Sequence, residues 1–444
     1  MSEKLIITGG QPLYGSVRVC GAKNASYKIM IASLLANSPS RLLNLPGIHD
    51  VMMTADIIRD LGGEVSDRGE RMLHIDPRDI KNHVLPHKYG EASRSSTMFL
   101  PILLSKFGKA TVPAPGGDKI GKRPLERHFE GLIALGAKVE AEGDNIKVKL
   151  PGGRFKGAHY RFAKNSHTGT ETLLMAAVLA DGLTVLENAA EEPEVDDLIN
   201  YLNRMGARIR RRSFRTIEIH GVENLEGTTY KIMPDRNETI SYACAAIATK
   251  GDVVIENARH EDLTAFLNKL TEINAGYEIG DYGVRFFYKG KLRPTDVTTQ
   301  IHPGFMTDWQ PLWATLISQA DGESIIHETV MQNRFQYVDV LREMGAHIEV
   351  IKEPQVQNPE DVYNFNLGDR SKDDIRAIKI FGPTKFHGGE FTIHDLRAGA
   401  TTILAALSGK GKTILHNLEQ LDRGYEKFDE KLISLGAKIE RVVE

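Results

Sequence analysis

The sequence contains few cysteines and no excess of charge of one sign. Cysteine occurs only at Cys20 and Cys244, far apart and without the spacing of a metal-ligand cluster. Lys and Arg number 56 against 59 Asp and Glu, a net charge of −3 that leaves no basic surplus to neutralise a nucleic-acid backbone. We therefore expect no nucleic-acid partner, no bound metal and no cofactor, and a reducing compartment.

Long apolar runs are also missing. No stretch reaches the roughly 20 residues that cross a bilayer, and residues 1–10 lack the apolar segment of a signal peptide. The 444 residues are 41% hydrophobic and 26% charged, which excludes disordered and collagen-like chains. The sequence thus indicates a cytoplasmic globular protein, without a membrane partner, that is long enough for two or three hydrophobic cores.

What the sequence does contain is an internal repeat. An apolar residue, a glycine, a small or aromatic residue, a polar position and a β-branched residue recur six times, mostly about 70 residues apart. Glycine suits the left-handed position that ends a helix, and the β-branched residue can begin a strand. The pattern predicts six helix-to-strand junctions. Their glycines are Gly62, Gly136, Gly206, Gly276, Gly345 and Gly436.

The last interval is longer than the others. A polar and charged stretch, residues 352–374, accounts for the extra length. We expect this insertion to be an excursion on the surface that leaves the period intact.

A second sixfold pattern consists of helices that are apolar on most sides and should therefore be buried. They occupy residues 24–36, 95–108, 168–182, 237–251, 307–322 and 396–411. Six units exceed one core, because chains split beyond about 250 to 300 residues. Three repeats in each of two domains follow, with a crossing between Glu226 and Met233. Composition alone leaves open which domain takes the N-terminal strand.

Polar residues stand at the starts of these apolar helices. Free N–H groups and the helix dipole make such ends anion sites, although caps and solvated ends are the simpler alternative. Lys23, Arg94 and Arg397 are informative, because the dipole opposes a cation there unless an anion lies between. The complete set is Lys23, Asn24, Arg94, Lys164, Ser166, His167, Asp235, Arg236, Glu238, Asp308, Asp395 and Arg397.

Two charged segments allow more than one interpretation. Residues 113–128 are glycine-rich and could form a lid over an anionic ligand or a plain exposed loop; their spacing excludes a P-loop. The basic stretch at residues 208–215 suggests a nucleic-acid contact, but its alternation with Ile209 and Phe214 favours a solvated strand face.

Several motifs together resemble the enolpyruvyl transferase family, over essentially the whole chain. They are GAKNAS at Gly21, GGDKIGKRP at Gly116, PDRNET at Pro234, HPGFMTDWQ at His302, DLRA at Asp395 and LDRGYEKFDEKLISLGAKIE at Leu421. Asn24 after Lys23 favours the UDP-N-acetylglucosamine branch, because the shikimate branch typically has Lys-Ser there. The resemblance implies a two-domain inside-out α/β barrel, with three repeats in residues 22–232 and three in residues 1–21 and 233–444.

The resemblance also implies a reaction, in which the enolpyruvyl group of phosphoenolpyruvate passes to the 3-hydroxyl of UDP-N-acetylglucosamine and phosphate leaves. This is the first committed step of peptidoglycan synthesis. Substrates would bind between the domains of a monomer or weak homo-oligomer. Several fixed cations would balance the trianionic donor without a metal.

Roles follow by motif. Lys23, Arg123 and Arg423 would hold phosphoenolpyruvate, while Asn24 and Asp308 would contact the sugar and Asp308 would take the proton of its 3-hydroxyl. The UDP-sugar site would further include Arg94, Arg123, Pro124, Leu125, Lys164, Asn165, Ser166, His167, Asp235 and the Val330 backbone. His128, Asp395 and Arg397 would support the site, and Lys23 and Arg397 are counted with Asp118 and Asp308 as catalytic.

Two positions depart from the family pattern. Asp118 replaces the lid cysteine that is thought to be the general acid and the target of fosfomycin. A free Asp has a pKa near 3.9, so acting as an acid at neutral pH requires an upward shift, which burial beside phosphate can supply. We expect an active, fosfomycin-resistant variant. Gln332 stands where Glu is common, and we expect a tuned site. Transfer to another nucleotide sugar, and a silent UDP-sugar-binding paralogue, remain alternatives.

Overall fold

A computed structural model describes residues 3–92, 94–114, 125–142, 145–369, 371 and 373–443. These residues form two compact units. The N-terminal unit comprises the described residues from Gly21 to Met233, and the C-terminal unit comprises those up to Cys20 and from Pro234 onward. Among the described residues, the chain passes from one unit to the other after Cys20 and again after Met233. Among the described residues, no helix is both long and apolar enough to cross a bilayer.

The N-terminal unit alternates short strands with helices. Its elements are α1 (Lys23–Ala32), η1 (Ser33–Leu35), β3 (Ser40–Leu43), α2 (His49–Asp60), β4 (Glu64–Asp67), β5 (Met72–Asp76), α3 (Lys88–Ala92), η2 (Arg94–Phe99), α4 (Leu100–Phe107), β6 (Lys109–Pro113), α5 (Glu126–Ala134), β7 (Lys138–Glu142), β8 (Asn145–Lys149), β9 (His159–Arg161), α6 (His167–Ala177), β10 (Leu183–Glu187), α7 (Pro193–Arg204), β11 (Arg208–Ser213), β12 (Thr216–His220) and β13 (Thr229–Lys231).

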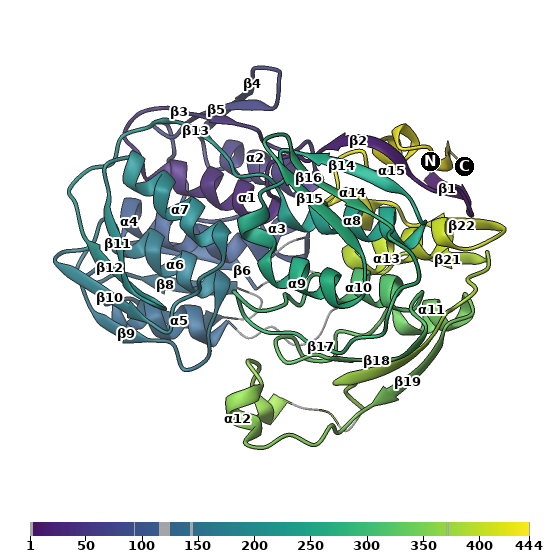
Figure 1. Cartoon of the computed structure of the whole chain (residues 1–444). Helices are drawn as coiled ribbons and strands as arrows, with labels where there is room; N and C mark the ends of the chain where they lie inside the picture. Colours follow the sequence, from purple (N-terminus) through teal and green to yellow (C-terminus); the bar gives the residue numbers. More distant parts are fainter. Residues whose placement is uncertain are drawn as a thin grey trace. The chain divides into compact units, whose positions relative to one another are not determined.

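The C-terminal unit has the same alternation (Figure 1). Its elements are β1 (Glu3–Thr8), β2 (Tyr14–Arg18), α8 (Arg236–Ala248), β14 (Asp252–Glu256), η3 (His260–Leu263), α9 (Thr264–Glu272), β15 (Gly276–Gly280), β16 (Gly283–Phe287), β17 (Val297–Thr298), α10 (Gln310–Ile317), β18 (Gly322–His327), α11 (Val338–Glu343), β19 (His347–Ile351), α12 (Pro359–Val362), η4 (Leu367–Asp369), β20 (Ala377–Gly382), β21 (Glu390–Thr392), α13 (Leu396–Ser408), β22 (Lys412–His416), α14 (Glu419–Asp422), α15 (Phe428–Ser434) and β23 (Lys438–Val443).

One sheet pattern recurs and confirms the sixfold repeat. In the sheet β11-β12-β10-β9, β9 runs parallel to β10, which pairs antiparallel with β12, and β12 forms a hairpin with β11. Four other sheets repeat this order with their own strands. The sheet β6-β8-β7 has three strands, and a parallel bridge between Val84 and Thr111 stands in the place of the fourth. In three of these sheets one buried helix connects the two parallel strands: α6 joins β9 to β10, α10 joins β17 to β18, and α13 joins β21 to β22.

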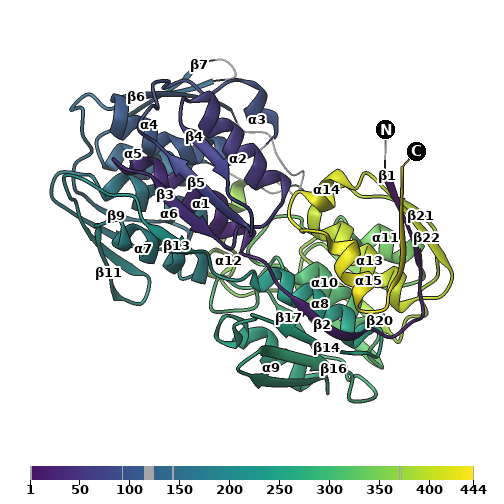
Figure 2. The same ribbon diagram turned by 90° about the horizontal axis from the view of Figure 1, so that it is seen from above.

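Segments that are distant in sequence complete the sheets. In the N-terminal unit, β13 pairs parallel with β3, so the last strand of the unit joins its first repeat. In the C-terminal unit, β1 lies between β22 and β23, and β2 pairs with β14. Figure 2 shows β1 beside β22, next to both chain termini. The N-terminal strands therefore belong to the C-terminal unit.

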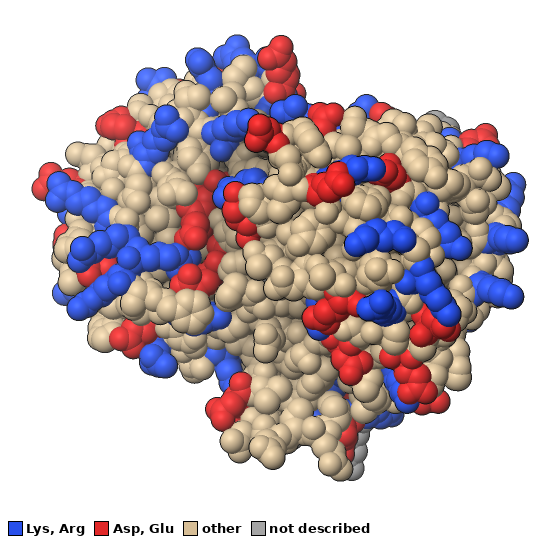
Figure 3. All heavy atoms as spheres, in the orientation of Figure 1, with Lys and Arg blue, Asp and Glu red and all other residues tan. Residues whose placement is uncertain are grey.

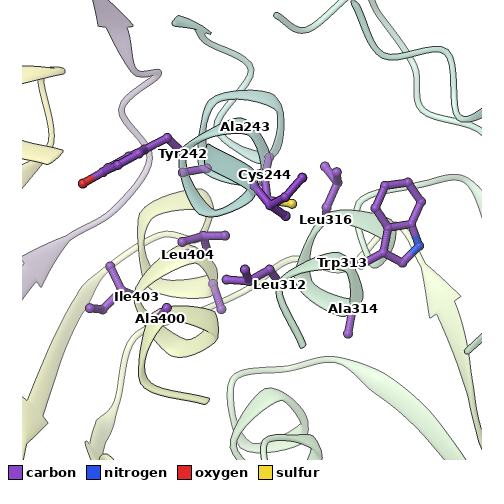
Figure 4. Packing of buried hydrophobic residues seen from close by; sticks show 14 of the residues in the cluster. Tyr242, Ala243, Cys244, Leu312, Trp313, Ala314, Leu316, Ala400, Ile403 and Leu404 are labelled. Carbon is purple, nitrogen blue, oxygen red and sulfur yellow. The ribbon is translucent and has the colours of Figure 1, made fainter. Parts of the chain in front are cut away.

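The apolar helices lie inside and the sheets outside, as the inside-out barrel requires. Helices α8, α10 and α13 pack against one another, with Cys244, Leu312 and Leu404 among their contacts (Figure 4). Every residue of α8 is buried. In the N-terminal unit α4 packs on α6, and α1 contacts η2. The fold expected from the apolar helices and the repeat is confirmed.

Five of the six predicted helix-exit glycines have a left-handed backbone. Gly62, Gly136, Gly206, Gly345 and Gly436 have φ between 98° and 108°. The prediction for Gly276 is wrong. Helix α9 ends two residues earlier, and Asn274, with φ 65°, occupies the left-handed position. Asparagine is the usual substitute for glycine at this position, which explains why the sequence pattern shifted by two residues.

The insertion at residues 352–374 is only partly the surface excursion that its composition suggests. Helix α12 has no buried residue, but Tyr363 is 1% exposed and Phe365 7% exposed. The Tyr363 hydroxyl lies 3.0 Å from Nε2 of His327, and the Asn364 amide donates to the Thr329 carbonyl at 2.8 Å. Because two aromatic side chains anchor it, the insertion folds back onto the end of β18.

The basic stretch at residues 208–215 contains all of β11, in which Ile209 is buried and the other residues are exposed or partly exposed, as in a solvated strand. Arg210 pairs with Glu218 at 2.7 Å, and Arg211 pairs with Asp196 and Glu191 at 2.6 and 3.0 Å. Basic and acidic side chains are interspersed where Figure 1 labels β11 and β12 (Figure 3). Acidic neighbours therefore balance this arginine cluster.

The left-handed glycines at the helix ends allow the cost of backbone strain to be measured without a change in side-chain packing. A Cβ added at Gly136 or Gly206 meets nothing within 4 Å, so alanine there costs only its left-handed conformation. We expect Gly136→Ala and Gly206→Ala each to lower the free energy of unfolding by about 1 kcal/mol in urea titrations. Asn274→Gly, the control, should leave it unchanged or raise it slightly. Equal losses in all three variants would contradict the assignment.

Candidate active site

In the C-terminal unit, two of the polar residues at helix starts are ordinary caps. Asp235 accepts hydrogen bonds from the amides of Asn237 and Glu238 at 2.7 and 3.0 Å. Asp395 accepts from the amides of Arg397 and Ala398, both at 3.0 Å. The capping interpretation therefore holds for these two aspartates.

Asp308, just before α10, lies between two arginines. Its Oδ1 is 2.7 Å from Nη2 of Arg334, and its Oδ2 is 3.9 Å from Nη2 of Arg397. The Asp308 side chain is 21% exposed, whereas the arginine side chains are 7% and 6% exposed. Asp308 is thus held by buried cations and retains access to the outside of its unit.

Arg397 is buried at the start of α13 and donates to the Tyr425 hydroxyl at 2.7 Å. Burial opposes its charge, but Tyr425, Asp308 and Asp235 outweigh that effect and raise the pKa of Arg397. Tyr425 in turn contacts Ser241 Oγ at 2.7 Å. This network fixes the guanidinium and keeps it charged.

The sequence motifs do not include Arg334 and Glu328, which support Asp308. Arg334 also donates to Oγ1 of Thr307 at 3.1 Å, and Thr307 donates to Glu328 at 2.9 Å. Glu328 is 1% exposed, and it accepts from Thr299 and from the Val330 amide, both at 2.8 Å. Burial raises the pKa of Glu328, against the opposing effect of these hydrogen bonds.

Gln332 is 6% exposed and lies in the same turn as Val330. Its amide nitrogen donates to the Asp369 carbonyl at 2.8 Å and to Oδ2 of Asp374 at 2.6 Å. Gln332 therefore ties the turn that carries Val330 to the insertion. A glutamate at this position would face the carboxylate of Asp374.

Arg423 follows α14 and is partly exposed, two residues before the buried Tyr425. It shares the C-terminal unit with Asp308, Arg397 and Val330. The structure thus brings Asp308 and Arg397 together at the starts of α10 and α13, and it connects Val330 to them through Glu328, Thr307 and Arg334.

In the N-terminal unit, Lys23 begins α1, and its ammonium group lies 3.1 Å from Asp50. Asn24 follows and is partly exposed. The anions expected beside Lys23 and Arg397 are thus supplied in part by the chain, as Asp50 and Asp308. The cations alone do not prove an anionic ligand.

The start of α6 is tied to α5. Ser166 caps α6 through the Gly169 amide at 3.1 Å, and His128 of α5 lies 2.9 Å from Oγ1 of Thr168. Arg127 donates to the Asn165 carbonyl at 2.9 Å, and Asn165 donates to the Asn188 carbonyl at 3.0 Å. His128 and the segment 164–167 are therefore neighbours, with Leu125 at the entry to α5.

Some predicted residues fall outside the described structure. Asp118, Arg123 and Pro124 are not described, and for Arg94 only its place at the start of η2 is. Among the residues that are described, no group of three or more His, Cys, Asp or Glu could hold a metal ion.

Comparison with known proteins identifies the family. The family model described as EPSP synthase (3-phosphoshikimate 1-carboxyvinyltransferase) matches residues 7–432. The chain belongs to this family. It is 39% identical over 447 residues to the UDP-N-acetylglucosamine 1-carboxyvinyltransferase of Xylella fastidiosa strain 9a5c, covering 99% of this chain and 100% of the relative. The enzyme of the same name from strain M12 matches at 39% with the same coverage.

Solved structures support the fold. The enolpyruvyl transferase NikO from Streptomyces tendae aligns with a TM-score of 0.86 and 23% identity, over 100% of this chain and 99% of NikO. An EPSP synthase structure from Acinetobacter baumannii aligns with a TM-score of 0.70 and 20% identity, over 100% of both chains.

The contact between Gln332 and Asp374 predicts the effect of restoring the common family residue. Gln332→Glu would place two carboxylates in a buried 2.6 Å contact, so we expect the free energy of unfolding to fall by about 2 kcal/mol. Thermal and urea unfolding would measure it. In the matched double variant, Gln332→Glu with Asp374→Asn, a donor and an acceptor face each other again. Equal loss in both variants would contradict this explanation.

Proposed function

We propose that the protein transfers the enolpyruvyl group of phosphoenolpyruvate to the 3-hydroxyl of UDP-N-acetylglucosamine and releases phosphate. The observation that carries this proposal is the 39% identity to named enzymes over the full length of both chains. The product would enter peptidoglycan synthesis, and the enzyme would act in the cytoplasm. The two units would be its two domains, and the functional protein would be a monomer or weak homo-oligomer.

The geometry around Asp308 supports a role as general base. One carboxylate oxygen lies near Arg334 and the other near Arg397, and the side chain remains 21% exposed, so it would be open to the substrate hydroxyl. Arg334 and Arg397 fix its position without covering it. A base held in this way needs little rearrangement when the acceptor hydroxyl loses its proton.

The donor site would combine cations from several motifs. Lys23, Arg123 and Arg423 would hold the phosphate and carboxylate of phosphoenolpyruvate, and Arg397 would stabilise charge near Asp308. Asn24 and the segment 164–167 would bind the nucleotide sugar, with Arg94, Pro124, Leu125, His128 and Val330. Lys23 and Arg397 are balanced by Asp50 and Asp308, so each cation is already oriented.

Replacing Asp308, the proposed base, should lower kcat and leave substrate binding nearly unchanged. For Asp308→Asn we expect kcat in a coupled phosphate-release assay to fall about 100- to 10,000-fold, with both KM values within a few-fold of wild type. The wild type, assayed with UDP-N-acetylglucosamine, with shikimate 3-phosphate and with other nucleotide sugars, tests the acceptor. Turnover with another acceptor alone would overturn the proposal, and background phosphate release with tight UDP-sugar binding would indicate a silent paralogue.

Asp118 would be the general acid in place of the cysteine common in the family. Because a carboxyl group lacks the nucleophilic thiolate, fosfomycin should cause no time-dependent loss of activity. Asp118→Cys should retain activity and become inactivated by the drug, and Asp118→Ala should lose most of kcat. Covalent inactivation of the wild type, detected as a mass increase on the intact protein, would contradict this role.

A further inference from the structure

A buried ion pair lies beneath the start of α6. Lys28 of α1 and Glu171 of α6 are 1% and 0% exposed, and Lys28 Nζ is 2.5 Å from Glu171 Oε2. His167, the first residue of α6, joins them. Its Nε2 is 3.2 Å from Lys28 Nζ and 3.2 Å from Glu171 Oε1. The three side chains form one cluster, which we call the α6 platform.

Such a pair is an expensive way to fill space. A buried ion pair usually stabilises a protein no better than apolar residues of similar volume, because both charges lose their hydration. Stability alone therefore does not explain this pair, and a further role is expected. The purpose suggested by the geometry is the imidazole above them. His167 is the member of the platform that reaches the exterior, because its side chain is 22% exposed while those of Lys28 and Glu171 are 2% and 0% exposed.

The platform constrains both the ring and its proton. Lys28 can only donate, so a neutral ring that accepts at Nε2 from Lys28 carries its proton on Nδ1. A charged ring carries protons on both nitrogens and donates from Nε2 to Glu171. Both forms present an N–H at Nδ1, for which the described part of the chain offers no hydrogen-bond partner. Only the neutral tautomer protonated at Nε2 would lack this donor.

The surrounding charges favour the charged ring. Burial is the largest single effect and lowers the pKa of His167, but the charge and the hydrogen bond of Glu171, together with the charge of Glu192, shift the net direction upward. Lys28 lowers this pKa, and Glu192 raises it. Glu192, the residue before α7, is 7% exposed, and its Oε2 has no hydrogen-bond partner among the described residues. Two carboxylates thus face the ring against one ammonium group.

We propose that Lys28 and Glu171 are positioning residues that orient His167 so that its Nδ1–H binds the diphosphate of the nucleotide sugar. The proposal rests on the proposed function, in which residues 164–167 bind that substrate. An anion fits this place, because His167 is the first residue of α6, at the N-terminal end of the helix dipole, and Lys164 precedes it by three residues. Lys28 and Glu171 themselves touch no substrate.

Single substitutions should move the His167 titration in opposite directions. Glu171→Gln removes the charge that raises the pKa, so the midpoint should fall, while Lys28→Met removes a charge that lowers it, so the midpoint should rise. NMR of the ring nitrogens in the free protein would measure both midpoints and the tautomer. A generic loss of packing would not shift them in opposite directions. A neutral ring protonated at Nε2 in the wild type would overturn the proposal.

Binding supplies the second readout. Either single variant leaves one buried charge without its partner and can fail to fold. Binding is therefore measured in the double variant Lys28→Met with Glu171→Leu, which removes both charges. In this variant we expect the Kd for UDP-N-acetylglucosamine and for UDP to rise about tenfold, the loss of one hydrogen bond to a charged group. The KM for phosphoenolpyruvate should stay within twofold. In the wild type, UDP binding should weaken as pH rises through the His167 midpoint.

A matched control removes a buried polar group of the same unit away from the platform. Tyr201 is fully buried and donates to Ser40 at 3.0 Å, so Tyr201→Phe should leave Kd, the His167 titration and KM unchanged. Unchanged UDP affinity in a folded double variant would overturn the proposal. The binding and NMR measurements need no turnover, so a wild type that binds UDP but does not transfer enolpyruvate would refute the proposed function and leave the platform intact.

Discussion

A helix that is apolar on every side cannot lie at a protein surface, and this constraint organises both units. Because all of α8 is buried, the strands of its repeat must lie outside it. The polar part of such a helix is its first turn, where unpaired N–H groups need partners. Polar side chains therefore gather at the helix starts, and many of the residues that we propose for the site stand there. The burial of the helices thus determines where these polar side chains lie.

Most charges at these positions are already balanced within their own unit. Asp308 meets Arg334 and Arg397, Lys23 meets Asp50, and Lys28 meets Glu171. Such pairing costs desolvation free energy, but it holds each cation where a substrate can use it without a large reorganisation. Glu328 acts in a similar way, since its buried carboxylate accepts hydrogen bonds from both the Thr307 hydroxyl and the Val330 amide and so holds them in place.

Periodicity predicted the fold because it is a local property. The buried helices and five of the six exit glycines follow from residues close in sequence, and the error at Gly276 arose where Asn274 takes the glycine position. The supporting residues were out of reach for the opposite reason. Lys28 meets Glu171 across more than a hundred residues, and Arg334 belongs to no repeated motif. Motif resemblance supplied the residues that we propose for the substrate site, whereas the residues that pair with them could be identified only from the coordinates.

The two departures from the family pattern differ in physical kind. Gln332 has a partner 42 residues away, because its side-chain amide donates a hydrogen bond to the carboxylate of Asp374. Asp374 thus supplies a carboxylate at the place where a glutamate would have brought one. The contact pairs a neutral amide donor with one carboxylate acceptor, and it involves none of the proposed reacting groups. In the proposed role of general acid, Asp118 would replace a weakly acidic thiol with a stronger acid and would change the proton transfers of the reaction. A bound trianion can compensate, since negative charge close to a carboxyl group favours its protonated form. Bound phosphoenolpyruvate would then keep the Asp118 carboxyl group protonated, and this group would protonate the methylene carbon of the same substrate. Asp118 would therefore be protonated only when the donor occupies the site.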